Sequence, residues 1–60
     1  MIYENLIGKD LTVYTNHSTQ FRGILKEVDS HDALLTFEVG IDEFIIRADA
    51  LYAITIHGTS

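Results

Sequence analysis

Beyond residue 9, the chain consists mainly of short runs in which apolar and polar residues alternate. Leu11 and Val13 alternate with Thr12 and Tyr14, and the same spacing of two recurs in the later runs. Successive side chains of a β-strand point to opposite faces, so this spacing gives each run one apolar face. The chain contains no proline, which would interrupt a strand inside a sheet. A mainly β protein is therefore predicted.

The turn-forming residues between the runs divide the chain into short elements within one domain, residues 1–60. A short helix is expected at about residues 2–7, ended by Gly8. Five strands are expected at about residues 10–15, 19–28, 33–39, 43–47 and 51–57. Short strands at this spacing are typical of an antiparallel meander that closes into a small SH3-like barrel.

Gly23 lies in the middle of the second predicted strand, on the same face as Phe21 and Leu25. Glycine has no Cβ atom, so a strand can bend sharply where it occurs. The predicted barrel is therefore strongly bent at this position.

The last two predicted strands carry more apolar residues than one small core can cover. The chain has 60 residues, 47% of them hydrophobic, and no cysteine that could form a disulfide. A domain of this size buries only about 60% of the surface of its unfolded chain, and apolar edge strands aggregate unless another strand pairs with them. We therefore predict self-association through these strands. The expected contact residues are Phe44, Ile45, Ile46, Leu51, Tyr52, Ile54 and Ile56.

Several classes of protein are not indicated by the sequence. Residues 1–6 lack the basic start and long apolar run of a secretion signal, and no apolar stretch is long enough to span a membrane. A cytoplasmic protein is expected. We expect no enzyme and no cofactor, because the chain has neither a glycine-rich phosphate loop nor a recognisable catalytic constellation. The three histidines, His17, His31 and His57, are too scattered for a metal site.

Two segments have a distinctive spacing of glycine, aspartate, arginine and apolar residues. Residues 21–31 read Phe-Arg-Gly-Ile-Leu-Lys-Glu-Val-Asp-Ser-His, and residues 45–54 read Ile-Ile-Arg-Ala-Asp-Ala-Leu-Tyr-Ala-Ile. With the N-terminal helix, they make nearly the whole chain similar to the Sm-like family, which includes the bacterial RNA chaperone Hfq. The matching positions are Phe21, Gly23, Leu25, Val28 and Asp29 in the first motif, and Ile46, Arg47, Ala48, Asp49, Leu51 and Ile54 in the second.

The resemblance implies a fold, an assembly and a ligand. Sm-like proteins are small bent barrels that form rings and bind single-stranded RNA. The resemblance therefore implies a closed ring of about five to seven identical subunits that acts as an RNA chaperone or an RNA-processing scaffold. It assigns RNA binding to His31, Arg47 and Asp49, with a base stacked on the imidazole and the guanidinium on a base or phosphate. Asp29 is expected to accept hydrogen bonds from backbone amides and hold the loop around His31.

The charge of the chain leaves a second interpretation open. The net charge is −5, with 4 basic residues against 9 acidic ones, and the basic residues form no cluster of the kind that binds nucleic acid. Ala33 and Ala48 stand where the Sm-like pattern has asparagine and glycine. The alternative is a ring whose RNA pocket is degenerate and whose partner is a basic protein or peptide. A third possibility is a monomeric SH3-like adaptor.

Individual residues also have alternative roles. Arg47 could equally form a structural ion pair with Asp49, Asp29 or Asp32. Tyr14 and Tyr52 belong either to the core or to a face of the barrel where they stack on a base or a peptide.

Overall fold

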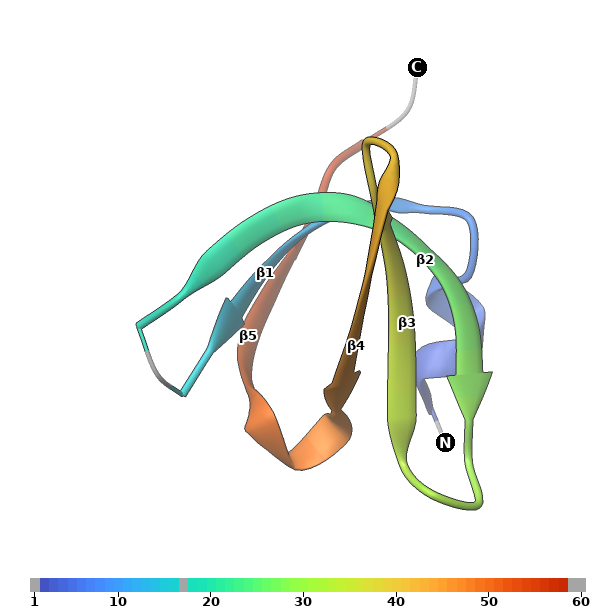
Figure 1. Ribbon diagram of the computed structural model, residues 1–60. Coiled ribbons are helices and arrows are strands. Elements are labelled where there is room, and N and C mark those ends of the chain that lie inside the picture. The colour runs from blue at the N-terminus through green and yellow to red at the C-terminus, as the bar shows by residue number, and fades with distance from the viewer. Residues whose placement is uncertain (1, 17, 59–60) are drawn as a thin grey trace.

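The chain folds into a five-stranded antiparallel sheet preceded by one short 3-10 helix (Figure 1). The computed structural model describes residues 2–16 and 18–58. The elements in chain order are η1 (Ile2–Leu6), β1 (Asp10–Thr15), β2 (Gln20–Asp29), β3 (Leu34–Val39), β4 (Asp42–Arg47), η2 (Ala48–Ala50) and β5 (Leu51–Ile56). The strand order is β4-β3-β2-β1-β5, so β4 and β5 are the two edges of the sheet. The prediction of a mainly β protein with five antiparallel strands is confirmed.

The predicted boundaries differ from the observed ones at a few residues. Ala33, expected to begin the third strand, has φ +56° and belongs to the turn before β3, because this left-handed backbone does not fit a strand. His57, expected in the fifth strand, follows β5. The N-terminal helix ends at Leu6, and Gly8 reverses the chain with φ +88°. The predicted turn at residues 16–18 includes His17, which lies outside the described residues.

The hydrophobic core is built from the inward faces of the three central strands. Its fully buried side chains are Leu11, Val13, Leu25, Leu35 and Phe37. The partly buried side chains around them are Tyr3, Leu6, Phe21, Val28, Val39, Ile46, Leu51 and Ile54. Tyr3 and Leu6 show that η1 covers part of the core, since a single turn of helix has no core of its own.

β2 connects the two halves of the sheet and is drawn as a long arc in Figure 1. Its first part pairs with β1, where Leu11 is opposite Gly23, and its second part pairs with β3. A Cβ atom at Gly23 would lie 2.6 Å from the Glu38 carbonyl oxygen and 2.8 Å from Val39 Cγ2. The close approach of β2 and β3 therefore requires glycine at this position.

A β-bulge at Lys26 changes which side chains of β2 face the core. Leu25 is paired with Phe37 and Glu27 with Thr36, so Lys26 is an extra residue. Strict alternation from Leu25 would turn Glu27 inward, whereas the bulge turns Val28 inward instead. The adjacent charges of Lys26 and Glu27 are thereby both kept in water.

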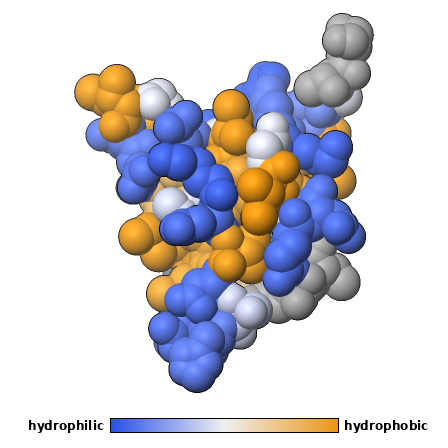
Figure 2. Space-filling model, turned by 90° about the vertical axis from the view of Figure 1, so that its right-hand side faces the viewer, coloured by the Kyte–Doolittle hydropathy of each residue, from blue (hydrophilic) through white to orange (hydrophobic). Residues whose placement is uncertain are grey.

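The two edge strands expose apolar side chains. Ile45 is 62% exposed, Tyr52 78% and Ile56 54%. The adjacent Ile46 packs against the core, which confirms that only one of the two isoleucines can face inward. Figure 2 shows one face of the molecule, where hydrophobic side chains reach the surface between hydrophilic ones. Within residues 2–16 and 18–58, no helix is long and apolar enough to cross a membrane.

Candidate functional site

Three connections meet at one end of the sheet, and hydrogen bonds join them. The Ala48 N–H donates to the Ala33 carbonyl at 2.8 Å, which ties η2 to the turn between β2 and β3. Asn16 donates its backbone N–H to the Ala50 carbonyl at 2.9 Å and its Nδ2 to the Asp49 carbonyl at 3.1 Å. The predicted residues His31 and Arg47 therefore belong to connected segments at the same end of the protein.

Asp29 makes the backbone contacts expected of a residue that holds the His31 loop. Its Oδ1 accepts hydrogen bonds from the backbone N–H groups of His31 at 3.0 Å and Asp32 at 3.2 Å. The His31 side chain is exposed and borders a shallow hollow with Glu27, Asp29 and Thr36. The carboxylates of this hollow would repel a phosphate, so the stacking surface of His31 lies in an acidic environment.

Arg47 and Asp49 form one of the ion pairs that the sequence left open. Arg47 Nη2 lies 3.3 Å from Asp49 Oδ2, and both side chains are more than 70% exposed. An ion pair this exposed adds little stability in water. The guanidinium can therefore leave Asp49 for a phosphate or a base at small cost.

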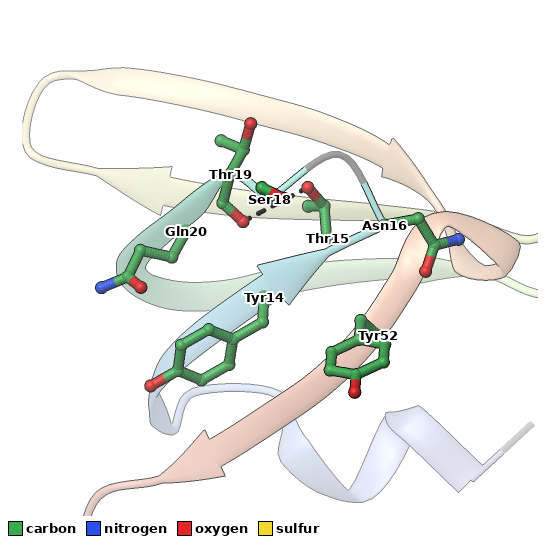
Figure 3. A pocket seen from close by; sticks show the side chains of 7 residues that line it. All are labelled: Tyr14, Thr15, Asn16, Ser18, Thr19, Gln20 and Tyr52. Atoms are coloured by element: carbon green, nitrogen blue, oxygen red, sulfur yellow. Dashed lines mark hydrogen bonds between the residues drawn. The ribbon is translucent and has the colours of Figure 1, made fainter.

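A second hollow lies on the outer face of β2, β1 and β5 (Figure 3). Tyr14 and Gln20 are opposite each other in the β1–β2 register. On the other side of β1, Tyr14 is paired with Ala53 and Thr15 with Leu51, so Tyr52 is an extra residue in β5. The lining residues are Tyr14, Thr15, Asn16, Ser18, Thr19, Gln20 and Tyr52.

The chemistry of this Tyr14–Tyr52 hollow differs from that of the His31 loop. Figure 3 shows the two tyrosine rings on the same face, one from β1 and one from β5, with the Gln20 amide beside Tyr14. The described residues that line it include no charged side chain. Aromatic rings and amides together can stack on a planar ring and hydrogen-bond to its edge. Asn16 belongs to this hollow and also donates a hydrogen bond to the Asp49 carbonyl, so it connects the hollow to η2.

The sequence raised Tyr14 and Tyr52 as surface aromatics but did not indicate that they share a hollow. The two residues come together only because β1 pairs with β5, and Tyr52 is placed by an irregularity in that pairing. Gln20 and Asn16 carried no recognisable signal, since amides are common beside turns. Tyr14 follows the buried Leu11 and Val13 and precedes the turn, so the alternation places its side chain on the outer face. This position was the sequence feature that could have indicated the hollow.

Most of the positive charge is committed to carboxylates of the same chain. Arg22 holds Asp10 with two hydrogen bonds, Nε to Oδ1 at 3.0 Å and Nη2 to Oδ2 at 2.7 Å, and these lower the pKa of Asp10. Lys26 Nζ lies 2.9 Å from Glu43 Oε2, and that hydrogen bond raises the pKa of Lys26. With Arg47 bound to Asp49, three of the 4 basic residues are paired. A broad basic surface is therefore not formed by the described residues.

Comparison with known proteins identifies no family for this chain. No protein-family model matches it, and no curated protein matches it. Within the described residues, no group of three or more histidine, aspartate or glutamate side chains could hold a metal ion.

Proposed function

We propose that the chain is a subunit of an Sm-like ring that binds single-stranded RNA as a chaperone or processing scaffold. The observation that carries the choice of ligand is the Tyr14–Tyr52 hollow, which offers two aromatic rings and two amides without a carboxylate. A nucleobase has the flat face and polar edge that such a hollow fits. The fold supports the proposal, since the sheet is antiparallel, bent and five-stranded.

The ring is supported by the two edges of the sheet. β4 and β5 expose Phe44, Ile45, Tyr52 and Ile56, and small domains rarely leave so much apolar surface on unpaired strands. In the proposed ring, β4 of one subunit adds to β5 of the next. Because each contact joins two different surfaces, repetition of the same rotation closes a ring.

RNA binding by this acidic chain is proposed to depend on stacking rather than on a basic surface. Each base stacked on an aromatic ring contributes about 1–3 kcal/mol to the binding free energy, and all four bases can stack in this way. Arg47, His31 and Asp49 extend the path toward the loop end, to which Asn16 connects the hollow. One weak site per subunit suffices, because a ring presents several copies to one strand.

The test is binding of labelled oligo-adenine and oligo-uridine to the parent and to variants of both regions. Loss of a stacked base predicts that Tyr14→Ala and Tyr52→Ala each weaken binding by about 5- to 150-fold. The conservative Tyr14→Phe keeps the aromatic side chain and should bind RNA like the parent. His31→Ala and Arg47→Ala should weaken binding by smaller factors. If Tyr14→Ala and Tyr52→Ala bind like the parent while the ring stays intact, the hollow is not the RNA site.

A second candidate function is a ring that binds a basic protein. It is favoured by the carboxylates Glu27 and Asp29 beside His31, and by the ion pairs that occupy three of the basic residues. A cationic peptide would be attracted to this acidic surface. A competition experiment separates the two functions: a protein-binding ring ignores oligo-uridine, oligo-adenine and DNA, but binds a lysine-rich peptide.

A further inference from the structure

The two edges of the sheet limit how one copy can add to another. β4 and β5 each contain six residues, and all strand pairs in the sheet are antiparallel. Phe44 packs its ring on Phe21, and Ile54 packs on the core, so both face inward. A shift by one residue would bring an inward side chain opposite an outward one. Tyr52 is an extra residue in β5, and the faces of the strand change there. Of the registers that keep Phe44 and Ile54 on one face, the one that opposes them directly pairs the most residues, 42–45 with 53–56 and Ile46 with Leu51 across the bulge.

This register brings two ionisable side chains of neighbouring subunits together. Glu43 becomes the partner of Thr55, and His57 is its diagonal neighbour, about 7–8 Å away and within reach of long side chains. Both lie on the outer face: His57 Nε2 is 2.6 Å from the outward-facing Thr12 Oγ1, and Glu43 binds the exposed Lys26. This register follows from the faces of Phe44 and Ile54 and from the number of paired residues, so the approach of His57 to Glu43 is a separate consequence of it.

The charges around these two residues favour a cation at the contact. Lys26 Nζ lies 2.9 Å from Glu43 Oε2 and 3.7 Å from Glu38 Oε2, so two carboxylates share one ammonium group. This outer cluster keeps one unbalanced negative charge. Within its own subunit, His57 faces Asp10, whose carboxylate Arg22 already holds, and donates its backbone N–H to the Asp10 carbonyl at 2.9 Å.

We infer that the contact between subunits is strengthened by a proton on His57, whose imidazolium binds Glu43 of the neighbouring copy. Imidazole groups gain their charge between about pH 8 and pH 5. The neighbouring carboxylate cluster is beside His57 only after assembly, so protonation and assembly favour each other. Ring formation should therefore be easier in mildly acidic solution. This inference rests on the proposed ring.

The experiment is sedimentation equilibrium of the full chain over a concentration series at about pH 8 and about pH 5.5, on either side of the imidazole range. The concentration at which half of the protein is assembled should fall by about two- to fivefold per contact at the lower pH, as expected for one exposed ion pair. His57→Asn and Glu43→Gln should each remove this difference. Circular dichroism checks that both variants remain folded.

Two control variants separate this contact from the general loss of negative charge at low pH. Asp42→Asn removes the same charge one residue away, on the opposite side of β4, and should keep the pH difference. His31→Asn removes a histidine from the other end of the sheet and should also keep it.

The possible results distinguish a failure of the inference from a failure of the proposed ring. A parent that assembles equally at both pH values overturns the inference, as does a full pH difference in His57→Asn or Glu43→Gln, or its loss in Asp42→Asn. In these cases the ring itself stands. A parent that stays monomeric at both pH values overturns the proposed ring, and the inference with it.

Discussion

Phe37 and Phe44 are opposite each other on adjacent strands, yet they have different surroundings. Both rings contact Phe21, with centroid distances of 5.3 Å for Phe37 and 4.9 Å for Phe44. Phe37, on β3, is completely buried, whereas Phe44, on the edge strand β4, is 40% exposed. A phenylalanine is therefore fully buried in the centre of the sheet and only partly buried at its edge. The chain therefore buries its central side chains by itself and leaves those of its edge strands partly exposed.

The largest expected effect is that of Phe37→Ala, which tests the central half of the comparison. Removing a fully buried phenylalanine costs about 3–5 kcal/mol, a large share of the stability of so small a domain. The variant should be mostly unfolded in urea titrations followed by circular dichroism. Phe44→Ala is the matched control: it should unfold at higher urea concentration than Phe37→Ala. Equal destabilisation would show that Phe44 contributes as much to the stability of the single chain as Phe37 does.

The next effect concerns the edge. Ile45→Lys places a charge on an outward side chain that is 62% exposed, so the fold of the single chain should change by less than about 0.5 kcal/mol. In the proposed ring the ammonium group would be opposite Ala53 of the next subunit, and because a lysine on an edge strand opposes the addition of another strand, assembly should be lost. The native mass reports this outcome. A variant that still forms the parent assembly would show that β4 is not a contact strand.

A smaller effect is expected at the turn between β2 and β3, which is hydrogen-bonded to η2. Ala33 has φ +56°, a conformation that costs a residue with a Cβ atom about 1–2 kcal/mol, and glycine avoids this cost but loses some entropy on folding. Ala33→Gly should therefore raise the free energy of unfolding by about 1 kcal/mol or less. The same change at Ala48, which has no positive φ, should lower it. Destabilisation by Ala33→Gly would mean that its side chain is needed in the turn.

The smallest effect concerns the ion pair between the central strands. The Arg22 hydrogen bonds lower the pKa of Asp10, so the pair stabilises the fold at pH values above the unfolded pKa of aspartate, about 3.9. This contribution is lost as the pH falls through the lowered, folded value. Arg22→Gln should shift the urea midpoint slightly downward at neutral pH and match the parent once the pH is below the lowered pKa of Asp10. A shift that persists in acid would point to lost packing of the arginine side chain instead.

The fold could be predicted from the sequence because its strands follow a simple alternation with clear turn residues. Leu11 and Val13 are buried as the spacing of two requires, and Gly23 lies where the β3 backbone leaves no room for a Cβ atom. The left-handed Ala33 was missed because alanine has no preference for that conformation. The bulge residues Lys26 and Tyr52 were missed because an extra residue is defined by its partner strand, not by its own type.

Prediction of the candidate site was limited in the same way. Asp29 acts on residues two and three positions away, so its hydrogen bonds to the loop could be expected from local sequence. The Tyr14–Tyr52 hollow joins distant parts of the chain, and its existence depends on the register of β1 with β5. Local patterns therefore indicated the loop, whereas the hollow required the three-dimensional pairing.

The bulge at Lys26 also has a consequence for how the chain tolerates changes in length. The bulge shifts the alternation of β2 by one residue: before it the inward side chains are at odd-numbered positions, whereas after it Val28, at an even-numbered position, faces inward. Deletion of one residue at the bulge would leave every later residue of β2 paired with its present partner in β3 and only straighten the strand. Deletion of Ile24 would instead invert the first half of β2, which brings Arg22 into the core and exposes Phe21 to water. A one-residue deletion in β2 is therefore tolerated at Lys26 itself and destructive before it.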